Sequence, residues 1–210
     1  MKKSNIKKAA IIITMYCLLF LLPMVLNQYI LDYTFNHALA HLTLSLFLLM
    51  TDYRSFKTHV YEYPSRPTKT LLLFLLSSCI ITILFLLHVG GMISLPYLFT
   101  RASDVPALLA FMECFSIYFC MHLNESYLFH TIHSILPNKW TRNLKSPISF
   151  IVFIAINLLL VIPFGMADVT SQIIYYISIG GILMVLNYFS SSFVIYVVST
   201  FMMLLVFASL

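Results

Sequence analysis

Long apolar runs recur through the 210-residue chain and constrain its fold more than any other feature. A helix needs about 20 mainly apolar residues to cross a bilayer. Backbone groups in lipid must be satisfied internally, and these continuous runs do not alternate in polarity as barrel strands do. We therefore expect an all-α, polytopic integral membrane helix bundle with about seven transmembrane helices. The predicted spans are 9–30, 36–51, 70–94, 105–129, 147–165, 171–189 and 192–209.

The small number of charged residues excludes a soluble domain. Only 9% of the residues are charged, whereas a soluble domain has about 25%. The net charge of +5 does not indicate nucleic-acid binding, because the basic residues are spread over short loops. The basic start and apolar run of residues 1–26 resemble a signal peptide, but no small-residue cleavage site follows them. We expect an uncleaved first transmembrane helix.

The basic residues predict the orientation of the bundle. With seven spans and a cytoplasmic N-terminus, eleven of the twelve Lys and Arg residues fall on the cytoplasmic side, as the positive-inside rule requires. Only Arg101 falls outside. The longest predicted loop, 52–69, is too short for a soluble domain. The eleven are Lys2, Lys3, Lys7, Lys8, Arg54, Lys57, Arg66, Lys69, Lys139, Arg142 and Lys145.

A polar stretch, NESYLFHTIH at 124–133, interrupts the apolar pattern. Ionisable residues at membrane depth indicate function by default. On a helix, His122, Glu125, His130 and His133 fall within about 140° of one another and share a face. The alternative is a helix end that meets water. The histidines are too few for the di-iron membrane enzymes, so we expect no metal and no cofactor.

The segment ESYLFHT, residues 125–131, resembles the glutamate motif of the CPBP family, the CAAX-processing and bacteriocin-immunity membrane proteases also called Abi proteins. That motif reads Glu-Glu-x-x-x-Arg. Glu125 matches the first glutamate, and Ser126 stands in place of the second. Phe129 matches an aromatic position, and His130 replaces the arginine.

Two further family motifs match in order but lack their histidines. The family's Phe-x-x-x-His corresponds to Phe153 and Asn157, with asparagine in place of histidine. The last motif, His followed by Asn, falls near Ser199 or Thr200, and no asparagine follows. The resemblance covers about 105–208. It implies one membrane domain, with N-terminal helices in 1–104 and a CPBP-like core in 105–210.

In the CPBP family the glutamate is thought to activate water, and histidines with asparagine complete the site. The missing histidines imply a non-catalytic scaffold in a bacterial cytoplasmic membrane, a partner-binding, regulatory or bacteriocin-immunity-type protein. Its partners would be the lipid bilayer and a membrane protein or peptide. Two alternatives stay open. One is an active endopeptidase whose rearranged site uses Glu125 with His130 or His133, and the other is a small permease or transporter subunit.

Overall fold

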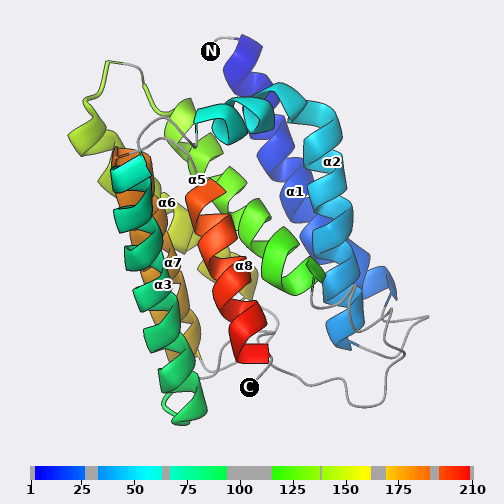
Figure 1. The fold of residues 1–210 in the computed structure, drawn as a ribbon. Coiled ribbons are helices and arrows are strands. Elements are labelled where there is room, and N and C mark those ends of the chain that lie inside the picture. The colour runs from blue at the N-terminus through cyan, green and yellow to red at the C-terminus, as the bar shows by residue number, and fades with distance from the viewer. Residues whose placement is uncertain are drawn as a thin grey trace.

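The computed structural model describes residues 3–26, 33–62, 67–93, 115–137, 139–161, 169–189 and 194–208 (Figure 1). These residues form helices and short turns and no strand, so the all-α prediction is confirmed for them. The helices are α1 (Lys3–Leu26), α2 (Tyr33–Glu62), α3 (Pro67–Val89), the π-helical segment η2 (Ser116–Met121), α5 (His122–Ile135), α6 (Arg142–Val161), α7 (Val169–Phe189) and α8 (Val194–Ala208).

Each predicted span overlaps one helix of the structure, with η2 and α5 together in the place of the fourth. Among the described residues, three helices are long and apolar enough to cross a membrane, which supports an integral membrane protein. These three segments are Thr70–Val89, Arg142–Leu159 and Val169–Phe189.

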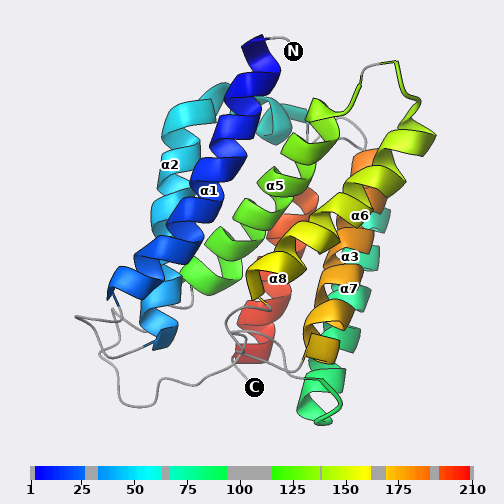
Figure 2. The same ribbon diagram turned by 180° about the vertical axis from the view of Figure 1, so that it is seen from behind.

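The predicted loop at 52–69 is wrong over much of its length. Helix α2 continues to Glu62, with a break at Asp52, where the backbone has φ −135° and ψ 37°. The apolar run ends near residue 51, but no proline or glycine follows until Pro64, so the helix continues beyond its apolar part. After the break, α2 turns and runs across the end of the bundle (Figures 1 and 2).

Successive helices alternate in direction, which brings the described basic side chains to the end where α1 begins (Figure 2). The Lys8 ammonium there donates to Ser134 Oγ at 2.8 Å, and the Arg142 guanidinium donates to the Tyr188 carbonyl at 2.8 Å. We call this the basic end. The cations there whose side chains the structure describes are Lys7, Lys8, Arg54, Lys57, Lys139, Arg142 and Lys145.

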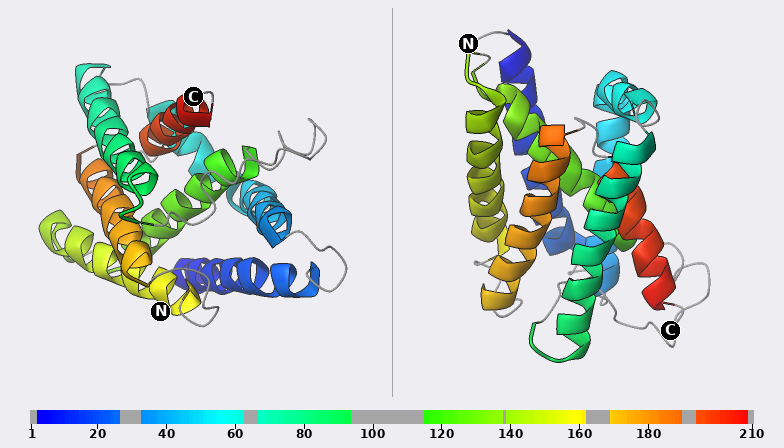
Figure 3. Two further views of the ribbon diagram at one scale, coloured as in Figure 1. Left: turned by 90° about the horizontal axis from the view of Figure 1, so that it is seen from below. Right: turned by 60° about the vertical axis from the view of Figure 1, so that its left-hand side comes forward.

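Helix α5 lies inside the bundle, in contact with α1, α2, α6, α7 and α8 (Figure 3). Every residue from His122 to Phe129 is buried. Beside α5, helices α6 and α7 pack closely against each other, because Gly180 of α7 has no side chain. A methyl group at Gly180 would lie 3.0 Å from the Phe150 ring and 3.2 Å from the Phe153 ring of α6. This arrangement places the polar residues of α5 in the core.

Candidate functional site

Glu125 lies in the core of the bundle, with 7% of its surface exposed. Its Oε1 accepts a hydrogen bond from the Tyr175 hydroxyl of α7 at 3.1 Å. Its Oε2 lies 3.0 Å from His122 Nδ1 and 3.1 Å from the Tyr196 hydroxyl of α8. The Tyr196 hydroxyl is also 2.8 Å from His122 Nδ1. We call Glu125, His122, Tyr175 and Tyr196 the Glu125 cluster.

One assignment of protons satisfies all four contacts of the Glu125 cluster. With Glu125 ionised, Tyr175 donates to Oε1, and both Tyr196 and the Nδ1–H of His122 donate to Oε2. The Tyr196 oxygen also accepts from Nδ1–H. This assignment places a proton on Nδ1 of His122. The cluster then joins α5, α7 and α8 through a single carboxylate.

The local sequence explains how His122 and Glu125 come together. They are three residues apart on α5, so their side chains lie on one face of the helix. The π-helical segment η2 ends at Met121, directly before His122. Such segments are rare and frequently occur at functional sites. Ser126, at the second glutamate position of the motif, donates from its hydroxyl to the His122 carbonyl at 2.7 Å.

The His122 ring is 1% exposed, and its Nε2 has no hydrogen-bond partner among the described residues. An imidazole whose Nδ1 is held by a carboxylate is the arrangement of a general base acting through Nε2. Glu125 itself is poorly placed to activate water, because both of its oxygens already accept hydrogen bonds from protein side chains. Within the cluster, His122 is therefore the better candidate base.

A second polar contact lies on another face of α5 and joins it to α2. The Ser45 hydroxyl donates to Asn124 Oδ1 at 2.9 Å. Asn124 Nδ2 donates to the His41 carbonyl at 3.1 Å and lies 3.3 Å from His41 Nδ1. Asn124 and Glu125 are neighbours in the sequence, so α5 is held on two sides by polar side chains in the core.

The other positions matched to family motifs make contacts within their own helices. Asn157 Nδ2 donates to the Phe153 carbonyl at 2.8 Å, and Ser199 Oγ donates to the Tyr196 carbonyl at 3.0 Å. Thr200 is completely buried and lies one turn of α8 after Tyr196. The side chains that contact Glu125 itself are His122, Tyr175 and Tyr196.

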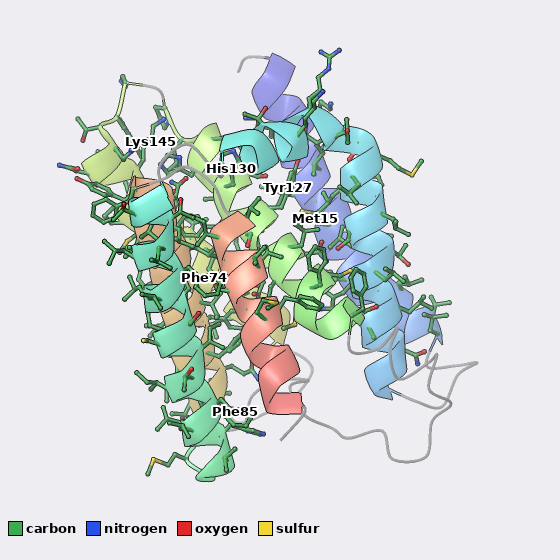
Figure 4. All side chains as sticks on the ribbon, in the orientation of Figure 1. Met15, Phe74, Phe85, Tyr127, His130 and Lys145 are labelled. Atoms are coloured by element: carbon green, nitrogen blue, oxygen red, sulfur yellow. The ribbon has the colours of Figure 1, made fainter. Side chains whose placement is uncertain are left out.

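His130 and His133 are partly buried near the C-terminal end of α5. Figure 4 shows His130 towards the basic end. They follow Glu125 by five and eight residues, and the described contacts of Glu125 involve neither of them. The pKa of His133 is lowered, first by burial and then by the positive charges of Lys145 and Arg142. His133 therefore favours its neutral form.

Sequence reasoning missed Tyr175 and Tyr196, which supply two of the contacts to Glu125. Tyrosine within an apolar run is ordinary, so neither residue was singled out. One signal was present: Tyr196 lies three and four residues before Ser199 and Thr200, on the same face of α8 as the positions matched to the final family motif.

Comparisons of the chain with family models, curated proteins and solved structures give no match. They assign the chain to no family, and the resemblance of residues 125–131 to the CPBP glutamate motif stays a hypothesis.

Proposed function

We propose that this chain is a multi-pass protein of a bacterial cytoplasmic membrane, with seven transmembrane helices and its basic end in the cytoplasm. The positive-inside rule and the gathering of basic residues at one end support this orientation. Exposed leucines along α3 support contact with lipid, because they would otherwise face water. They are Leu71, Leu72, Leu75, Leu76 and Leu86.

The protein acts as a non-catalytic, CPBP-like scaffold that binds a membrane protein or peptide, in a regulatory or immunity role. One observation carries this proposal: both oxygens of Glu125 are occupied by side chains from α5, α7 and α8. A water-activating carboxylate needs an oxygen that water reaches in productive geometry. Glu125 instead fits a polar tie that holds three helices together.

Hydrolysis within the membrane is the second candidate. It is favoured by Nε2 of His122, which is buried and has no hydrogen-bond partner among the described residues. In this reaction His122 would accept a proton from water, while Glu125 fixes the ring and stabilises its charge. This version of the site differs from the one predicted with His130 or His133. It requires His122 as the base, and it requires Glu125 to orient the His122 ring and to stabilise its charge.

The test is a purification of partners from native membranes in detergent, with wild type, Glu125→Gln and Asn157→Ala as baits. Glutamine keeps the size of Glu125 and removes its charge, and Asn157→Ala changes a motif position outside the Glu125 cluster. The scaffold predicts that one partner copurifies with all three proteins. A peptide precursor that is retained only by Glu125→Gln would support hydrolysis and contradict the scaffold.

A further inference from the structure

The part of α2 after its break, residues 53–62, forms a surface across the basic end of the bundle. We call it the crossing segment. It leaves the direction of α2 at Asp52 and passes over the bundle (Figure 1). In a protein that spans a bilayer, a helix in this position lies at the boundary between lipid and water.

Contacts from α5 and α1 hold the break in place. The buried Tyr127 of α5 donates from its hydroxyl to Asp52 Oδ2 at 2.5 Å. The Lys7 ammonium of α1 donates to the Thr51 carbonyl at 3.4 Å. This contact ties the first part of α1 to the turn of α2 that precedes the break. The direction of the crossing segment is therefore fixed by contacts with two other helices.

The crossing segment presents positive charge to its surroundings. Arg54 and Lys57 are exposed and lie three residues apart on one face. Tyr53, beside Arg54, is 62% exposed, and tyrosine is enriched at membrane interfaces. The carboxylate of Asp52 is engaged by Tyr127. From residue 53 to 69 the sequence has four basic residues and one acidic residue: Arg54, Lys57, Arg66 and Lys69 against Glu62.

We propose that the crossing segment lies along the cytoplasmic membrane surface and binds the phosphate groups of anionic lipids through Arg54 and Lys57. Each basic residue near an anionic leaflet contributes about fivefold to binding, and the effect falls off within a Debye length of about 8–10 Å. The break at Asp52 turns this segment across the end of the bundle, and a segment that lies along the membrane surface brings both cations within that distance of the headgroups. This inference rests on the transmembrane placement proposed above and is independent of the role of Glu125.

The test measures the lipid shell around the full chain reconstituted in phosphatidylcholine bilayers. Electron paramagnetic resonance gives the selectivity of this shell for spin-labelled phosphatidylglycerol over spin-labelled phosphatidylcholine. Wild type is compared with the double variant Arg54→Gln/Lys57→Gln. The variant Lys139→Gln removes one exposed cation from another loop of the basic end and serves as the matched control. Arg54→Lys/Lys57→Arg keeps both charges.

Wild type is expected to select phosphatidylglycerol. The double glutamine variant loses up to about fivefold of that selectivity per removed cation, and the charge-keeping variant retains it. Lys139→Gln, which removes a single cation outside the crossing segment, loses clearly less than the double variant. Tyr127→Phe removes the hydrogen bond that holds Asp52 at the break but keeps both cations, and it loses part of the selectivity for phosphatidylglycerol. Equal selectivity in wild type and the double variant would overturn the proposal, and so would a loss in Lys139→Gln as large as in the double variant.

Two further results separate this proposal from its assumptions. If no lipid is motionally restricted by the protein, the transmembrane placement is wrong. If restricted lipid is present without selectivity, the placement stands and the crossing segment does not bind anionic lipid. Potassium phosphate is expected to reduce the selectivity no more than potassium chloride of equal ionic strength. A larger reduction by phosphate would indicate a site for free phosphate and contradict lipid binding.

Discussion

Replacing Tyr196 with phenylalanine removes one hydroxyl from the Glu125 cluster and leaves the aromatic ring in place. The variant loses a donor 3.1 Å from Glu125 Oε2 and a contact 2.8 Å from His122 Nδ1. The carboxylate keeps Tyr175 and His122, so it does not become an isolated buried charge. The expected cost is therefore that of one charge-assisted hydrogen bond.

A hydrogen bond to a charged group contributes about 1.5–3 kcal/mol in soluble proteins, whereas hydrogen bonds between membrane helices average about 0.6 and reach about 1.7 kcal/mol. The Tyr196 contacts are buried and involve a carboxylate, which places them near the upper end of the membrane range. We expect Tyr196→Phe to lower the free energy of unfolding by about 1–2 kcal/mol.

The assay is reversible unfolding by sodium dodecyl sulfate in lipid–detergent micelles, followed by circular dichroism. Tyr188→Phe is the matched control, because its exposed hydroxyl donates to Asn143 Oδ1 at 3.0 Å and carries no charge-assisted contact. Removing this exposed hydroxyl changes the free energy of unfolding by no more than about 0.5 kcal/mol. Equal costs for Tyr196→Phe and Tyr188→Phe would refute the assignment of a special role to the Glu125 cluster.

Three further predictions use the same unfolding assay. Gly180→Ala lowers the free energy of unfolding by about 1–3 kcal/mol, because its methyl group would lie 3.0 Å from the Phe150 ring of α6. Gly181→Ala is the control: no described atom lies within 4 Å of its methyl group, so it is neutral or stabilising. Similar losses in the two variants would contradict this packing. Asn124→Ala lowers the free energy of unfolding by about 1–3 kcal/mol, because it removes the hydrogen bonds of Asn124 with Ser45 and with the His41 carbonyl of α2. An unchanged free energy of unfolding would show that these hydrogen bonds do not stabilise the bundle. The pKa of His133 is lowered in the folded protein, so unfolding takes up a proton and stability falls as the pH drops below about 6.5. His133→Gln should reduce this loss, measured as the difference in unfolding free energy between pH 7.5 and pH 5.5, and an identical pH dependence would refute the argument.

The sequence predicts the helices well where apolar length decides the structure. The predicted spans 171–189 and 192–209 agree closely with α7 (Val169–Phe189) and α8 (Val194–Ala208). The prediction is wrong after residue 51, because the end of an apolar run does not mark the end of a helix. Helix α2 changes direction at Asp52 and then continues through the polar residues to Glu62.

The candidate site was predictable where its contacts are local. His122 and Glu125 are three residues apart, so the helical period places them on one face, and the structure brings them to 3.0 Å. Tyr175 and Tyr196 are 50 and 71 residues from Glu125, and their contacts depend on how α7 and α8 pack against α5. No periodic pattern within one helix carries that information.

The central claim, that Glu125 holds helices together and does not serve hydrolysis, is tested most directly by the peptides in the native membrane. Mass spectrometry would compare membranes containing equal amounts of wild type and Glu125→Gln protein. The scaffold predicts the same peptides and precursors in both samples. A cleavage product that disappears in Glu125→Gln, with its precursor accumulating, would contradict the claim and place the Glu125 cluster in a reaction.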